Sequence, residues 1–187
     1  MAKFTIAEEI TGGNEGLYAN NPADTGGETW AGIARNYWPK WKGWSIIDTI
    51  KLQFGNSAKI INKYGSVDPN LKNLVSLFYK QNFWDINKLD QFNDQQLANT
   101  VYDFGVNSGT GRSAKFLQQA VNDLGVFEIG VDGSIGNMTL SAVNNSDSKR
   151  LYDAFNKRRT DFYVSIAKGS QAQFLKSWLS RIKPYKS

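Results

Sequence analysis

Apolar residues recur every three to four positions along most of the chain, which predicts helices. The clearest helix start is Asp68-Pro69, because an Asp cap followed by Pro at the first helical position is typical of a helix N-terminus. Asn93 or Asp94 is expected to open another helix, and Ser45 is the expected N-cap of a short one. The pattern therefore predicts a mostly α chain.

A polar segment rich in glycine interrupts this helical pattern over residues 16–35. Its Gly, Asn, Pro and Asp residues stand at positions typical of turns, which predicts a loop or a small hairpin after the first helix. The first helix carries Phe4 and Ile10 in its apolar spacing and is expected to fray near Gly12-Gly13. Glu15 is therefore predicted to lie at or just past the end of that helix.

The absence of two residue types restricts the chemistry. The 187 residues include no His and no Cys, which excludes disulfides, Cys nucleophiles, Ser-His-Asp triads and the usual zinc sites. At 41% hydrophobic residues the chain can bury a core, and no apolar run reaches the roughly 18 residues that a membrane span needs. Any reaction must therefore use carboxylates, hydroxyls, amides or lysine.

Three polar residues around the predicted hairpin are candidate catalytic groups. Cleavage of a glycosidic bond needs only carboxylates: one acid protonates the leaving oxygen, and a second group stabilises the oxocarbenium ion or activates water. Glu15 is the candidate acid, because a Glu backed by apolar residues at a helix end can have its pKa raised toward neutrality. A hairpin would bring Asp24 and Thr29 back opposite Glu15 to position water. The alternative is that Asp24 and Thr29 are ordinary turn and cap residues.

A second set of candidates lies further along the chain. Asp103 and Asn107 are four residues apart and share one face of a predicted helix, for which the alternative is a solvent face or a helix cap. Tyr79 and Trp84 suit the apolar faces of sugars, and they equally suit a protein core. The glycine-rich turn at residues 130–136 lacks the Lys-Ser/Thr of a phosphate-binding loop.

The net charge of +5 lies entirely in residues 96–187, and from Lys149 onward ten residues are basic and two are acidic. This distribution favours a polyanionic partner, such as an anionic cell wall, a membrane surface or nucleic acid, and the alternative is a solvated basic helix face. The first 13 residues do not have the pattern of a secretory signal. We therefore expect synthesis in the cytoplasm without an evident signal peptide and export by another route, unless a signal has been removed.

Several short motifs in the first 110 residues form a recognisable series. They are Glu15-Gly16-Leu17-Tyr18, Asp24, Gly26-Gly27-Glu28-Thr29, Gly32-Ile33, Tyr79-Lys80 through Trp84, and Asp103-Phe104-Gly105-Val106-Asn107-Ser108-Gly109. The series resembles glycoside hydrolase family 108, the bacterial and phage N-acetylmuramidases, some of which are called secretion activator proteins. Leu17 replaces a glycine of the family motif, which should alter loop flexibility more than chemistry. The order Glu, Asp, Thr is also similar to that of phage-type lysozymes, with one residue fewer between Asp24 and Thr29.

The second half of the chain resembles the peptidoglycan-binding domain commonly fused to this family. The matching residues are Leu117-Gln118, Val131-Asp132-Gly133-Ser134-Ile135-Gly136, Thr139-Leu140, Ala142-Val143, Arg159, Phe162-Tyr163 and Phe174 through Arg181.

The resemblance implies a mostly α, lysozyme-like fold with a small hairpin or loop after the first helix. Residues 1–92 would form the catalytic region and residues 93–187 a helical peptidoglycan-binding-like region, packed together as one compact unit. The implied activity is cleavage of the β-1,4 bond between N-acetylmuramic acid and N-acetylglucosamine in peptidoglycan glycan strands, at the cell wall or in the periplasm, without a metal or an organic cofactor. Glu15 would be the acid, assisted by Asp24 and Thr29. The residues expected to contact substrate are Tyr18, Tyr79, Trp84, Asp103 and Asn107.

Three alternatives stay open at the level of sequence. A lytic transglycosylase would use the same Glu without water and leave a 1,6-anhydro product. A non-catalytic wall-binding or secretion-assisting protein would bind the wall without cleaving it. A nucleic-acid binder is the least favoured, because the most distinctive motif lies in the neutral half, so no nucleic-acid partner is expected.

Overall fold

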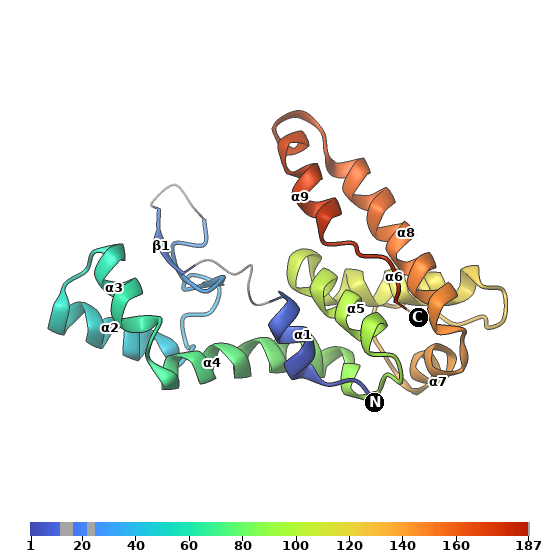
Figure 1. The fold of residues 1–187 in the computed structure, drawn as a ribbon, viewed down its shortest axis with the longest axis horizontal. Helices are drawn as coiled ribbons and strands as arrows, with labels where there is room; N and C mark the ends of the chain where they lie inside the picture. Colours follow the sequence, from blue (N-terminus) through green and yellow to red (C-terminus); the bar gives the residue numbers. More distant parts are fainter. Residues whose placement is uncertain (12–16, 22–24, 187) are drawn as a thin grey trace. The chain divides into compact units, whose positions relative to one another are not determined.

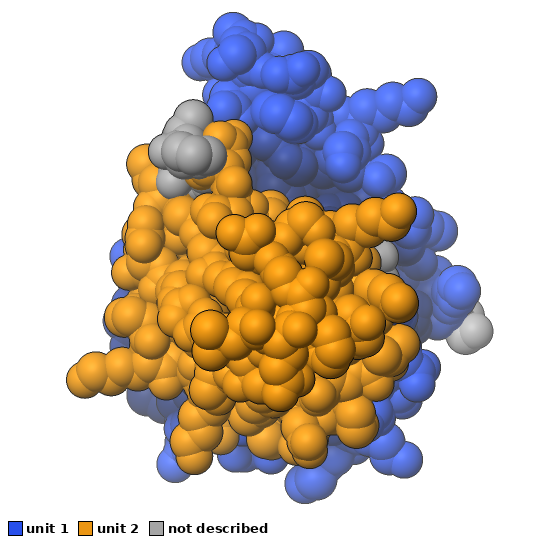
Figure 2. Space-filling model, turned by 90° about the vertical axis from the view of Figure 1, so that its left-hand side faces the viewer, with its two compact units in different colours: residues 1–10, 82–187 blue, residues 11–81 orange. Residues whose placement is uncertain are grey.

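The computed structural model describes residues 1–11, 17–21 and 25–186 (Figure 1). Helices dominate, and one small antiparallel sheet follows the first helix, so the predicted mostly α, lysozyme-like architecture with a hairpin is confirmed. The chain divides into two compact units, residues 11–81 and residues 1–10 with 82–187 (Figure 2).

The sheet of the unit 11–81 contains three short antiparallel strands in the order β1-β2-β3. They are β1 (Tyr18–Asn20), β2 (Glu28–Trp30) and β3 (Ile33–Ala34). Ala31 and Gly32 join β2 to β3 with φ values of 46° and 77°, as in the two-residue turns whose twist matches a hairpin. The Gly-Ile motif thus has a structural reason, since Gly32 adopts the turn conformation and Ile33 is completely buried.

Three helices complete this unit: α2 (Gly43–Phe54), α3 (Ala58–Gly65) and α4 (Pro69–Tyr79). Asp68 caps α4 by accepting a hydrogen bond from the Leu71 N–H at 2.8 Å, as predicted. The prediction for Ser45 is wrong, because α2 begins at Gly43 and the Ser45 hydroxyl donates back to the Lys42 carbonyl. A turn that precedes α2 leads into it without a side-chain cap, and the Trp41 ring occupies the space that a side chain at residue 43 would need.

The remaining elements belong wholly or mostly to the unit formed by residues 1–10 and 82–187. They are α1 (Phe4–Thr11), a π-helix (Lys80–Trp84), 3-10 turns (Asp85–Asn87, Leu89–Gln91 and Gly169–Phe174), α5 (Gln95–Ser108), α6 (Thr110–Asp123), α7 (Asn137–Asn145), α8 (Ser148–Ile166) and α9 (Leu175–Ser180). Asp94 caps α5 through the Leu97 N–H at 2.7 Å, which confirms one of the two expected helix starts. The boundary between the units falls inside the π-helix.

The core of the unit formed by residues 1–10 and 82–187 lies where α5, α6 and α8 pack against one another. Phe104, Leu117 and Phe155 are completely buried there, and burying apolar surface of this kind is the main stabilising contribution to such a bundle. Phe4 on α1 packs edge-on against Trp84 and Tyr102. By contrast, α9 and the 3-10 turn before it contain no buried residue, so side-chain bonds and ring contacts hold this segment.

Candidate active site

Glu15 and Asp24, the two predicted catalytic carboxylates, lie outside the described residues. The chain immediately after Asp24 is described and is fastened in place. The hydroxyls of Thr25 and Tyr37 lie 3.1 Å apart, and the Asn36 side-chain amide donates to the Thr25 carbonyl at 3.0 Å. The segment that follows Asp24 is therefore tied to the chain that follows β3.

Thr29 and Tyr18 lie on neighbouring strands of the hairpin but point to opposite faces of the sheet. Thr29 is paired with Ala19, and Tyr18 with Trp30, and successive side chains on a strand alternate between faces. The Thr29 hydroxyl donates to the Gly27 carbonyl at 3.2 Å. The structure thus keeps both residues at the hairpin without bringing their side chains together.

A cluster of four charged residues links the hairpin to α2. The Arg35 guanidinium binds both oxygens of Asp48, at 2.8 and 2.7 Å, and also donates to Glu28 at 2.8 Å. Lys51 pairs with Glu28 as well and lies 3.7 Å from Asp48. Two cations and two carboxylates thus compensate one another, and the cluster fixes β2 against α2.

The charge state of Glu28 follows from this cluster. Burial raises the pKa of Glu28, but hydrogen bonds and charge from Lys51 and Arg35 outweigh burial and lower the pKa below its usual value of 4.5. On the same face of the sheet, burial and the negative charge of Glu28 raise the pKa of Tyr18. Glu28 is therefore ionised at neutral pH and cannot serve as a general acid there.

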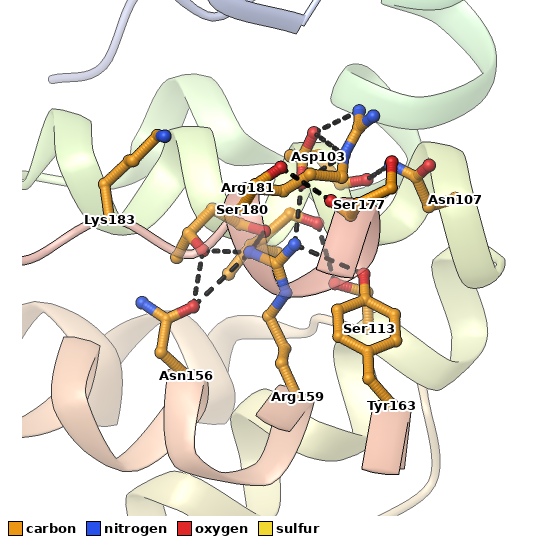
Figure 3. A network of polar contacts seen from close by, with 12 residues as sticks. Asp103, Asn107, Ser113, Asn156, Arg159, Tyr163, Ser177, Ser180, Arg181 and Lys183 are labelled. Atoms are coloured by element: carbon orange, nitrogen blue, oxygen red, sulfur yellow. Dashed lines mark hydrogen bonds and ion pairs between the residues drawn. The ribbon is translucent and has the colours of Figure 1, made fainter. Parts of the chain in front are cut away.

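Asp103 lies in the unit formed by residues 1–10 and 82–187, at the centre of a network that joins α5, α8 and the residue just after α9 (Figure 3). Its carboxylate is 2.6 Å from the Arg159 guanidinium and 2.6 Å from that of Arg181. Arg159 also contacts Thr100, which is buried. Asp103 is thus part of an interior contact between helices, whereas Asn107, on the same predicted face, is exposed.

The other predicted substrate contacts occupy different environments. Asn107 is exposed, and its amide donates to the Asp103 carbonyl at 2.6 Å. Tyr79 is 7% exposed and donates its hydroxyl proton to the Ala31 carbonyl at 2.7 Å, which holds the turn between β2 and β3. Trp84 has no exposed surface and packs against Phe4 and Tyr102. Trp84 therefore presents no surface to a ligand in this arrangement, and its observed role is packing.

The glycine-rich turn at residues 130–136 is organised by one buried amide. Gln118 donates to Asp132 at 2.8 Å and to the Ser134 carbonyl at 3.0 Å, and it accepts from the Gly133 N–H at 2.9 Å. This turn therefore has a structural role that accounts for its residues.

The sequence alone did not predict the cluster of ion pairs formed by Glu28, Arg35, Asp48 and Lys51. Glu28 stands inside the motif Gly26-Gly27-Glu28-Thr29, and the spacing of Asp48 and Lys51 places them on one face of a helix. The ion pairs of Glu28 and Asp48 with Arg35 form only in the folded chain. Within the described residues, no group of His, Cys, Asp and Glu is arranged to hold a metal ion. No helix in the described part of the chain has both the length and the apolarity needed to cross a membrane.

Comparison with known proteins assigns both halves of the chain. The model of a family described as glycosyl hydrolase 108 matches residues 9–109, and that of a predicted peptidoglycan domain matches residues 112–183. Among solved structures, SagA of Brucella abortus is 24% identical, with 96% of this chain and 88% of that chain covered and a TM-score of 0.63, a likeness that concerns the fold. No curated protein matches this chain.

Proposed function

Because the chain belongs to the glycosyl hydrolase 108 family, we propose that it is an N-acetylmuramidase. It would hydrolyse the β-1,4 bond between N-acetylmuramic acid and N-acetylglucosamine in peptidoglycan. The observation that carries this proposal is the pairing of a glycosyl hydrolase match at residues 9–109 with a peptidoglycan domain match at residues 112–183. A hydrolase region and a wall-polymer region in one chain suit an enzyme that acts on an insoluble polymer.

Glu15 is the proposed general acid, and the other carboxylates of the unit 11–81 support this choice. Glu28 and Asp48 are both ion-paired with Arg35, and their pKa values are lowered. Asp68 is committed to the cap of α4. An acid that donates a proton at neutral pH needs a raised pKa, which leaves Glu15 and Asp24 as the candidates in this unit.

The reaction then follows the general course of glycoside hydrolysis. The Glu15 carboxylic acid gives its proton to the glycosidic oxygen as the bond from that oxygen to the sugar C1 breaks, and positive charge develops on the sugar ring. Asp24 would stabilise this charge or take a proton from the attacking water, and Thr29 would help to hold that water. The fastening of Thr25 by Asn36 and Tyr37 supports such a role, because it anchors the chain next to Asp24.

The second half of the chain is proposed to hold the enzyme on the anionic wall. Lys168, Lys176 and Lys183 are exposed in its C-terminal part, and such cations attract polyanions at long range. Residues 1–92 would form the catalytic region and residues 93–187 the peptidoglycan-binding-like region. The enzyme would be made in the cytoplasm and act at the cell wall or in the periplasm.

Digestion of purified sacculi by the wild type and Glu15→Gln tests the proposal. Glu9→Gln is the matched control, because Glu9 is an exposed carboxylate on α1. The wild type and Glu9→Gln should release muropeptides with reducing ends, and Glu15→Gln should lose at least about 100-fold in rate, as expected when a general acid is removed. Equal activity of Glu15→Gln and wild type would overturn the site assignment.

Mass spectrometry of the same digests separates hydrolysis from the two alternatives. Products with 1,6-anhydro ends would show a lytic transglycosylase instead. Sacculus binding without any released product, in both the wild type and Glu15→Gln, would show a non-catalytic wall-binding protein.

A further inference from the structure

A groove of about 470 Å³ runs between α2 and the segment from α3 to the start of α4 in the unit 11–81. Its volume lies in the range of small-molecule sites. The residues that line it are Ser45, Ile46, Thr49, Ile50, Gln53, Phe54, Tyr64, Val67, Asp68 and Asn70. Apolar and polar side chains therefore both line one concave surface.

The apolar part of the groove is an aromatic pair. The rings of Phe54 and Tyr64 are stacked, with centroids 4.0 Å apart and planes inclined by 16°. Phe54 remains 46% exposed, so part of its ring is available to a ligand. A flat, exposed aromatic surface suits the apolar face of a sugar ring.

The polar part follows one face of α2. Ser45, Thr49 and Gln53 are spaced four residues apart, so they form a row along the helix. The hydroxyl protons of Ser45 and Thr49 are donated to the helix backbone, which leaves their oxygens to accept hydrogen bonds. Within the described part of the chain, the side-chain amides of Gln53 and Asn70 have no hydrogen-bond partner and can both donate and accept.

The charge of the residues that line the groove favours a neutral ligand over an anionic one. Asp68 is one of its lining residues, and no Lys or Arg is among the described residues that line it. A phosphate-rich wall polymer or a carboxylate-bearing peptide would meet the Asp68 carboxylate. A neighbouring cation, the Lys63 ammonium, lies over the Tyr64 ring at 5.0 Å from its centroid. A neutral saccharide fits, because its hydroxyls can donate to Oδ2 of Asp68, since Oδ1 accepts the cap bond of α4, and can pair with the amides.

We propose that this groove is a second glycan-binding site, which takes a neutral N-acetylhexosamine segment of a glycan strand. It is separate from the hairpin, because α2 directs Asp48 and Lys51 toward Glu28 from nearly the opposite face of the helix. The choice of N-acetylhexosamine rests on the proposed function. The groove adds affinity for an insoluble polymer without taking part in bond cleavage.

The test uses the full chain carrying Glu15→Gln, labelled with ¹⁵N and titrated with a soluble β-1,4-linked trimer of N-acetylglucosamine. The amides of Thr49, Gln53, Tyr64 and Asn70 should shift on addition of the trimer. Phe54→Ala should weaken this binding about 3- to 10-fold, the range expected for loss of one aromatic contact. Leu52→Ala is the control, because Leu52 is 89% exposed on the same helix and does not line the groove.

Gln53→Ala repeats the test at an exposed position where the fold is not at risk. The proposal would be overturned if Phe54→Ala and Gln53→Ala both bound the trimer at the groove as tightly as the parent protein. It would also be overturned if the trimer shifted only the amides of hairpin residues, or if only a stem peptide shifted the groove amides. If the trimer binds at the groove but the wild type releases no muropeptide from sacculi, the proposed activity is wrong and the proposed binding site is still supported.

Discussion

Arg159 has no exposed surface, and its guanidinium lies 2.6 Å from the carboxylate of Asp103. Arg181 reaches the other oxygen of the same carboxylate at 2.6 Å. One Asp on α5 thus forms ion pairs with an Arg on α8 and with an Arg just after α9 (Figure 3). Since α9 contributes no buried residue, this carboxylate is a principal attachment for the C-terminal segment.

Replacing Asp103 should strongly destabilise the protein. Asp103→Ala leaves the buried Arg159 cation without its counter-charge, which typically lowers the free energy of unfolding by about 3–5 kcal/mol. Asp123→Ala removes the partner of the more exposed Arg158 and should cost less than about 1 kcal/mol. Urea unfolding of the two variants compares them directly. Similar losses for both would show that the Asp103 network contributes no more than a surface ion pair.

Glu28 should make the free energy of unfolding of the protein fall in acid. Its pKa is lower in the folded protein than the usual 4.5, so the unfolded chain binds a proton first as the pH falls. Its stabilisation is therefore fully present above the unfolded value and is lost as the pH falls through the folded value. Glu28→Gln should be less stable than wild type at pH 7 and should lose less stability between about pH 5 and pH 3.

Urea unfolding across this pH range measures the effect, with Glu128→Gln as the control because Glu128 is an exposed carboxylate in the other unit. The control should follow the wild-type curve. If the free energy of unfolding of Glu28→Gln fell as steeply with acid as that of the wild type, other groups would cause the acid sensitivity. Asp48 is the first candidate, because its pKa is also lowered by Arg35.

Local signals in the sequence predicted the helix starts well and the long-range partnerships poorly. Asp68 and Asp94 cap helices because the cap bond joins residues three apart, which a sequence displays directly. The prediction that Ser45 caps α2 was wrong, because a preceding turn and the bulk of Trp41 determine where α2 begins. Glu28 could not be assigned from its neighbours, since its partners Arg35 and Lys51 meet it only through folding.

At the candidate site, too, the environment of a side chain depends on residues far away in the sequence. Tyr79 and Trp84 carry side chains that suit either a sugar or a core, and the sequence offers no way to choose between the two. The structure shows Tyr79 bound to the hairpin turn and Trp84 inside the core. Their positions within a family motif are thus explained by support of the fold around the hairpin and α1.

The amide of Gln118 should be more important for stability than that of its neighbour. Gln118→Ala leaves several polar groups of the turn at residues 130–136 unpaired, which should lower the free energy of unfolding by about 2–3 kcal/mol. Gln119→Ala removes a single bond from Arg158 and should cost less than about 1 kcal/mol. Thermal unfolding compares the variants, and sacculus binding should fall only for Gln118→Ala. Equal stabilities would show that the turn does not depend on this amide.

Two glycines should respond in opposite directions to the same substitution. A Cβ on Gly65 would lie 2.5 Å from the ring of Trp30, which is buried on β2, so Gly65→Ala should destabilise the protein by about 1–3 kcal/mol through overpacking. A Cβ on Gly111 of α6 would meet no atom within 4 Å, so Gly111→Ala should stabilise by about 0.5–1 kcal/mol through higher helix propensity. Urea unfolding measures both changes in stability.

The same two variants should also differ in activity. Because Trp30 adjoins Thr29, Gly65→Ala should slow sacculus digestion, whereas Gly111→Ala should leave the rate unchanged. A destabilised Gly65→Ala protein that digests sacculi at the wild-type rate would show that catalysis does not depend on the position of β2.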